Sequence, residues 1–137
     1  MNDAANLKLQ SIRVRTEMAS GNIAPLLHEI RHALALLASD GASNIIDLQG
    51  IPLAPGEVET ILAALGEGEV RVELQSLGKS EIRETSYPGV WLVTHYDEAG
   101  DLKARFIEIT RMPQILESQP DDIAEGLTRL EVKLRTS

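Results

Sequence analysis

The sequence contains no cysteine among its 137 residues. This absence excludes disulfides, thiolate nucleophiles and cysteine-ligated zinc or iron–sulfur clusters within the chain. No apolar run approaches the roughly 18 residues that a membrane span needs. The opening MNDAANLKLQ lacks the charged and apolar regions of a signal peptide. We therefore expect a cytoplasmic protein with no membrane partner.

Aromatic residues are also scarce, at 3% of the chain. Aliphatic side chains must therefore fill the interior, and the 43% hydrophobic content is enough for one globular domain with its own core. We predict a single domain over residues 1–137. Residues 1–21 form an N-terminal arm or edge strand in this prediction, and residues 118–137 contain a C-terminal helix.

Positive charge is rare in the middle of the chain. The net charge is −8, and residues 40–101 hold twelve acidic residues against Arg71, Lys79 and Arg83, a local balance of −9. An acidic surface repels phosphate backbones, so we expect no nucleic-acid partner. It would steer a basic protein partner toward the chain. Simple solubility explains the same charge equally well.

Hydrophobic periodicity divides the chain into helical and extended segments. Apolar residues recur at helical spacing in residues 22–39, 55–65 and 121–135. A short apolar run at 44–48 predicts a buried strand, and residues 69–110 switch to a period of two with turn signals between four strands. The predicted fold class is α+β, an antiparallel four-stranded meander plus the short strand, with the helices packed on the sheet.

The C-terminal helix carries a separate apolar seam. Ile123, Leu127, Leu130 and Leu134 follow heptad-like spacing. Packing of this seam onto the sheet is the favoured interpretation. Pairing of two such helices in a homodimer remains an alternative, and with it the hypothesis that the chain is a homomeric scaffold.

One motif points to metal chemistry. Residues 28–32, HEIRH, match the H-E-x-x-H pattern in which two histidines bind zinc and the glutamate activates water. The helical core stripe centres near Ile30 and Leu37, so His28 and His32 are predicted to face solvent. A third ligand is missing, because His95 falls on a strand. We favour an exposed helix face and keep a small zinc-dependent hydrolase as the alternative.

Other motifs of catalysis are absent from the sequence. There is no G-x-S-x-G, no Walker loop and no G-x-G-x-x-G, and the glycines at 66 and 68 stand between a helix and a strand, the wrong context for phosphate. We therefore expect a protein that is not an enzyme and that binds no cofactor.

Five segments together resemble a known family. The most specific are LGEGEV at 65–70 and ETSYPGVWLV at 84–93, followed by FIEI at 106–109. Upstream, NIAPLLHEIRHALALL and IIDLQGIPLAP are similar to the same family. The chain resembles the hydrogenase expression/formation proteins of the HupH/HyaF type, over residues 20–117, and we place their conserved C-terminal domain at 22–117.

The resemblance implies a role in maturing uptake [NiFe] hydrogenases. Members of the family are accessory proteins implicated in assembling hydrogenase subunits, especially the iron–sulfur small subunit. The expected partner is thus a hydrogenase subunit or another hydrogenase accessory protein. The resemblance carries over no catalytic residue, and it implies a chaperone-like protein that acts by binding.

The residues themselves suggest where a partner would bind. Glu84, Tyr87, Pro88, Gly89 and Trp91 surround one strand junction, and exposed aromatic residues often anchor protein interfaces. The alternative is that the Pro-Gly pair is turn chemistry and that the tryptophan belongs to the core. We favour exposure for the tyrosine and burial for the tryptophan.

Overall fold

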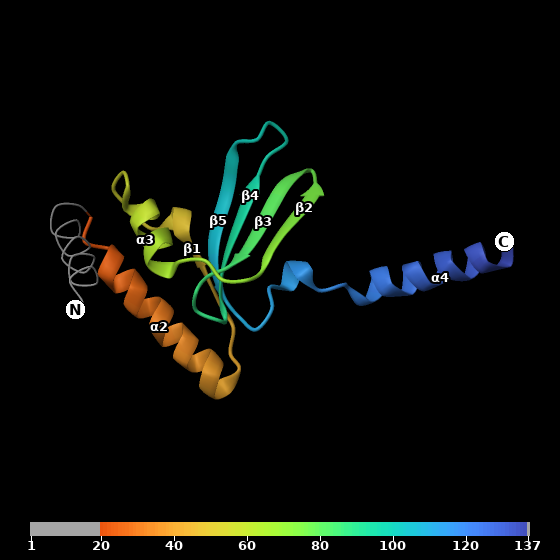
Figure 1. Cartoon of the computed structure of the whole chain (residues 1–137), viewed down its shortest axis with the longest axis horizontal. Coiled ribbons are helices and arrows are strands. Elements are labelled where there is room, and N and C mark those ends of the chain that lie inside the picture. Colours follow the sequence, from red (N-terminus) through yellow and green to blue (C-terminus); the bar gives the residue numbers. More distant parts are fainter. Residues whose placement is uncertain (1–19, 137) are drawn as a thin grey trace.

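The computed structural model describes residues 20–136, so most of the predicted N-terminal arm lies outside the described part. Helices and strands alternate much as the periodicity predicted (Figure 1). The elements, in chain order, are α2 (Ile23–Asp40), β1 (Asn44–Asp47), the 3-10 turn η1 (Leu48–Gly50), α3 (Glu57–Leu65), β2 (Arg71–Ser76), β3 (Gly78–Glu84), β4 (Val90–Tyr96), β5 (Leu102–Ile109), η2 (Gln114–Leu116) and α4 (Pro120–Thr136).

The five strands form one antiparallel sheet in the order β1-β5-β4-β3-β2. Strands β2 to β5 are the predicted meander, each hydrogen-bonded to the strand that follows it. The short strand β1 pairs with β5, where Ile46 lies opposite Ile107. The α+β class is thus confirmed, and β1 extends the four-stranded meander to five strands.

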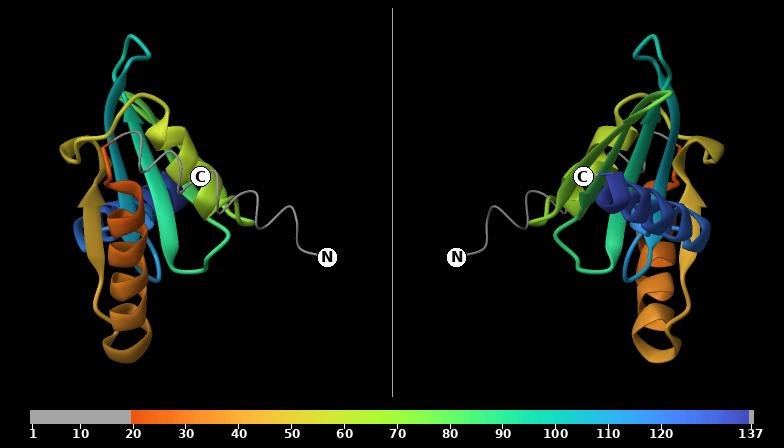
Figure 2. Two further views of the ribbon diagram at one scale, coloured as in Figure 1. Left: turned by 90° about the vertical axis from the view of Figure 1, so that its left-hand side faces the viewer. Right: turned by 90° about the vertical axis from the view of Figure 1, so that its right-hand side faces the viewer.

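Helices α2 and α3 lie on the same side of the sheet (Figures 1 and 2). Their apolar stripes pack against the side chains that strands β1, β4 and β5 direct to that side. Burying such a stripe stabilises a helix far more than its intrinsic propensity does. The buried members of this core are Ile23, Leu26, Ile30, Ala33, Ile46, Leu48, Ile61, Leu65, Val90, Leu92, Ile107 and Ile109.

A second, smaller cluster lies on the opposite side of the sheet. It is centred on Ile82, Trp91 and Val93. Trp91 and Val93 alternate along β4 with Val90 and Leu92 of the main core, and Ile82 lies opposite Val93 on β3. Val72, Leu74, Phe106 and Leu116 of η2 cover its margins. Strand β4 is consequently buried on both faces, which explains its continuous apolar run.

The prediction that the C-terminal helix packs on the sheet is wrong. The helix itself is confirmed, but α4 has no buried residue and extends away from the sheet (Figure 1). Its apolar seam faces solvent, because the chain that leaves η2 at Glu117 leads away from the sheet instead of back across it. In the described part of the chain, no helix is long and apolar enough to cross a membrane.

Candidate partner-binding site

The junction between β3 and β4 is a tight turn built around Thr85. The Thr85 backbone N–H and hydroxyl both donate to the Val90 carbonyl, at 3.0 and 2.8 Å. The Thr85 hydroxyl oxygen also accepts from the Tyr87 N–H at 3.2 Å, and Val90 N–H donates to the Tyr87 carbonyl at 2.9 Å. Because Thr85 is buried, these bonds fix the backbone on which Tyr87 is displayed.

Gly89 presses the turn against helix α2. Its φ of +94° lies in the left-handed region that favours glycine, and a Cβ there would lie 3.1 Å from methyl groups of both Leu34 and Leu37. The Gly89 carbonyl accepts from the Thr110 N–H at 2.9 Å. The turn is therefore held between α2 and the end of β5.

The segment 65–70 completes the support from the other side. Gly68 N–H donates to the Glu84 carbonyl at 2.8 Å, and Glu69 N–H donates to Glu84 Oε1 at 3.2 Å. Ser86 donates twice to the Leu65 carbonyl, from its N–H at 2.9 Å and its hydroxyl at 2.6 Å, which satisfies a carbonyl at the end of α3. The two most specific segments of the sequence thus meet at one place in the fold.

The five predicted contact residues do not share one environment. Tyr87 is 50% exposed and Pro88 is exposed, whereas Glu84 and Gly89 are half-buried. Trp91 is only 6% exposed, and its indole N–H donates to the Thr110 carbonyl at 3.1 Å. Tyr87 is therefore exposed and Trp91 is buried, as we favoured from the sequence, and Tyr87 and Pro88 are the accessible members of the five candidates.

All three basic residues of the acidic segment 40–101 form salt bridges. Each pairs with a glutamate of the same segment, so the other nine acidic residues of 40–101 have no salt bridge to a described base. This distribution leaves the segment with a net negative charge that can attract a basic partner. The pairs are Arg71 with Glu81, Lys79 with Glu73 and Glu81, and Arg83 with Glu67.

Two carboxyl groups, those of Glu57 and Glu108, have pKa values shifted from the usual value. Burial raises the pKa of Glu108, which lies opposite Trp91 in the register of β4 and β5. The hydroxyl of Ser20 at 2.6 Å and the backbone N–H of Ala54 at 2.5 Å lower the pKa of Glu57. Both hydrogen bonds favour the ionised carboxylate. The bond from Ser20 also joins the start of α3 to the chain before α2.

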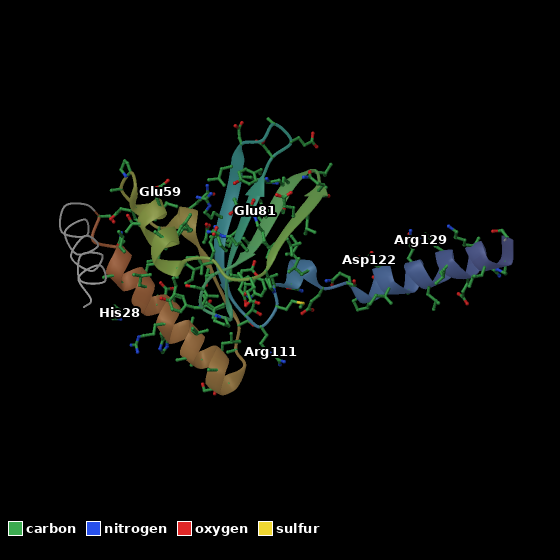
Figure 3. All side chains as sticks on the ribbon, in the orientation of Figure 1. His28, Glu59, Glu81, Arg111, Asp122 and Arg129 are labelled. Atoms are coloured by element: carbon green, nitrogen blue, oxygen red, sulfur yellow. The ribbon has the colours of Figure 1, made fainter. Side chains whose placement is uncertain are left out.

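The histidine motif lies on the outer side of α2. His28 and His32 are both exposed, as predicted, and Figure 3 shows His28 on the side of the helix away from the sheet. His95 lies on the sheet, where its Nδ1 is 2.7 Å from the Ser80 hydroxyl. Among residues 20–136, no three His, Asp or Glu side chains gather closely enough to hold a metal ion.

Two open hollows lie away from the turn. One of about 480 Å³ lies between the ends of two hairpins, beside Lys79 and Tyr96. The other, of about 350 Å³, is lined mainly by aliphatic side chains of residues 48–58 and by Leu102 and Arg105 of β5. Neither of these two hollows includes a residue of the turn.

Sequence reasoning missed the residues that position this surface. Thr85, Ser86 and Gly68 hold the turn in place but are not contact candidates themselves. The paired glycines at 66 and 68 were the available signal, because glycine often marks a close backbone approach.

Known proteins share both the sequence and the fold of this chain. The family model described as HupH hydrogenase expression protein, C-terminal conserved region, matches residues 21–136. The hydrogenase expression/formation protein HoxQ of Azotobacter vinelandii is 31% identical over 114 residues, which cover 80% of this chain and 39% of that protein. The chain thus spans well under half the length of this curated relative.

A solved structure supports the same relationship. The hydrogenase expression protein HupH from Thiobacillus denitrificans ATCC 25259 superposes with a TM-score of 0.82 at 38% identity, covering 87% of this chain and 99% of that one. The family match also reaches further than the resemblance seen in the sequence, since it includes α4. This chain belongs to the family of HupH hydrogenase expression proteins, whose C-terminal conserved region it contains.

Proposed function

We propose that this protein is a non-catalytic accessory factor that assists the maturation of an uptake [NiFe] hydrogenase by binding one of its subunits. The iron–sulfur small subunit is the proposed target, and the exposed Tyr87–Pro88 turn is the proposed contact. Membership of the family supports the hydrogenase connection.

One observation carries the binding mode. The two segments that identify the family, 65–70 and 84–93, converge on a single turn whose backbone is fixed from several sides. A preorganised turn loses little conformational entropy on binding, and a half-exposed tyrosine offers a large contact area with few rotatable bonds. Such an arrangement favours recognition of another protein.

The charge distribution supports a basic or positively charged region on the partner. The three cations of residues 40–101 pair with glutamates, and the segment stays net negative even when Lys103 and Arg105 of β5 are counted with it. Electrostatic attraction of this kind raises the association rate and weakens as salt concentration rises. Binding of the partner should therefore slow as ionic strength increases.

No specific observation favours the zinc-hydrolase alternative. Its two histidines lie exposed on the outside of α2, and the described residues bring no third ligand to them. A zinc site with an open catalytic position needs three protein ligands.

The test is a binding measurement between this chain and the iron–sulfur small subunit encoded in the same organism, prepared without oxygen. The wild-type chain should bind, and Tyr87→Ala should raise the dissociation constant by about 30-fold, the effect of losing an interface anchor residue. Leu77→Ala is the matched control, because Leu77 is 82% exposed in the turn between β2 and β3, within another part of the sheet.

Each outcome has a separate meaning. Absence of binding by the wild-type chain would refute direct recognition of the small subunit. Binding that Tyr87→Ala leaves unchanged, in a variant with the wild-type circular dichroism spectrum, would show that the turn is not the contact.

A further inference from the structure

Helix α4 is exposed along its whole length. None of its 17 residues is buried, and it stands away from the sheet (Figure 1). An isolated helix of this length is marginal in water, and most helices in proteins owe their stability to a covered apolar face. The matched family region runs through residue 136, so this helix is part of the family's domain.

The apolar seam of α4 has the spacing of a coiled coil. Ile123, Leu127, Leu130 and Leu134 follow one another at intervals of four, three and four residues, which places them at alternating d and a positions. Their side chains are between 56% and 69% exposed. A strict two-position seam is narrower than the stripe by which a helix packs on a sheet, and it fits a second helix.

We propose that α4 is a dimerisation helix that pairs in antiparallel orientation with α4 of a second copy of this chain. In the central register, Ile123 lies opposite Leu134 of the second copy and Leu127 lies opposite Leu130. The pairing has a two-fold axis, so each helix covers the apolar seam of the other and no apolar seam is left exposed.

Charge selects the antiparallel orientation. The first turn of α4 holds Asp121 and Asp122, and the last turn holds Lys133 and Arg135. Antiparallel pairing brings the acidic end of each helix beside the basic end of the other, and it also opposes the helix dipoles. Parallel pairing would place like charges side by side at both ends. Figure 3 shows Asp122 near the start of the helix and Arg129 further along it.

The residues beside the seam complement one another in the same register. The flanking positions are small in the first half of the helix, at Ala124 and Gly126, and long in the second half, at Glu131 and Lys133. Antiparallel pairing sets Ala124 opposite Glu131 of the second copy and Gly126 opposite Lys133. Each long side chain then lies over a small one, so its stem covers the seam without a clash.

The shape of the molecule leaves room for this pairing. Helix α4 is about 26 Å long at 1.5 Å per residue, and no part of the described chain covers it. Two antiparallel helices would therefore hold the two sheets at opposite ends of a short rod. This dimer does not depend on the proposed function, because no hydrogenase protein takes part in it.

The test uses the purified full chain alone, by sedimentation over roughly a hundredfold range of protein concentration, because self-association follows mass action. The wild-type mass should double as the concentration rises. Leu127→Asp should weaken association at least about 100-fold, because it would bury an unpaired charge. Leu77→Asp, an equally polar change in the β2–β3 turn, should leave the dimer intact. A wild-type chain that stays monomeric throughout, or a dimer that survives Leu127→Asp, would overturn the proposal.

A charge substitution tests the orientation. In the proposed register Gly126 lies opposite Lys133 of the second copy, whereas parallel pairing would set it beside Glu131. Gly126→Glu should therefore strengthen the dimer, and Gly126→Lys, a change of similar helix propensity, should leave it weaker than Gly126→Glu does. A Gly126→Lys chain that associates as tightly as the Gly126→Glu chain would refute the antiparallel arrangement, since only that orientation brings position 126 beside Lys133.

Discussion

Replacing Gly68 with alanine is expected to destabilise the fold by an amount that the structure allows us to work out. A Cβ at Gly68 would overlap the backbone carbonyl oxygen of Thr85 and would lie 2.7 Å from Glu84 Oε1. The φ of Gly68 is not in the left-handed region, so the effect is steric alone. The Thr85 carbonyl belongs to the hydrogen-bonded turn, so it cannot move away from the new Cβ without disturbing that turn.

Two contributions give the magnitude. Overpacking of a rigid site costs about 1–3 kcal/mol. The Gly68 N–H bond to the Glu84 carbonyl, now 2.8 Å long, would lengthen or break at a net cost of about 1 kcal/mol. The free energy of unfolding should therefore fall by about 2–4 kcal/mol, a large part of the stability of a typical domain.

Urea unfolding followed by tryptophan fluorescence measures this change. Trp91 is the only tryptophan and is buried, so its emission reports on the sheet next to the turn. Gly50→Ala is the matched control, because its Cβ would come no closer than 3.6 Å to any neighbour, and its unfolding free energy should change by less than about 1 kcal/mol.

A double variant separates the two steric contacts. Glu84→Ala removes the carboxylate but leaves the Thr85 carbonyl in place, so Gly68→Ala should still destabilise a Glu84→Ala chain by most of the same amount. A Gly68→Ala chain within about 0.5 kcal/mol of wild type, the usual range of surface substitutions, would refute the steric argument.

Two further predictions concern pH. Hydrogen bonds from Ser20 and Ala54 lower the pKa of Glu57 from 4.5. Its contribution to stability is therefore present above pH 4.5 and is lost as the pH falls through the lowered value. Urea unfolding below pH 4.5 should show that Glu57→Gln loses less stability than wild type on acidification. Equal acid sensitivity of the two chains would contradict this. Burial raises the pKa of Glu108 above 4.5, so this carboxyl group should cost wild type stability as the pH rises from 4.5 through the raised value. Glu108→Gln should not show this loss. Parallel curves of unfolding free energy against pH for the two chains, between pH 4.5 and neutrality, would exclude the effect.

Local patterns predicted the individual elements well. The helical spacing predicted residues 22–39, and the observed helix α2 is Ile23–Asp40. The period of two between 69 and 110, broken by glycine and proline, predicted all four strands of the meander. These features depend on neighbours within a few residues, because backbone hydrogen bonding and side-chain direction repeat with a fixed local period.

The environment of the candidate site was harder to predict. Whether Trp91 is buried depends on the far side of the sheet, where Ile82, Phe106 and Leu116 come from three other elements. The sequence showed an aromatic residue beside a turn, which suits both a core and an interface. The contact of 65–70 with the turn likewise joins residues that are some 15 to 21 positions apart.

The sequence by itself determined the family, the α+β class, the positions of the helices and strands, and the exposed histidines on α2. Only the tertiary structure decided that Trp91 is core while Tyr87 is accessible, that Gly68 supports the turn, and that α4 leaves the sheet. The physical reason is that periodicity shows which face of an element must be covered, but the covering surface is made by residues distant in the chain. For α4, the described chain provides no such surface.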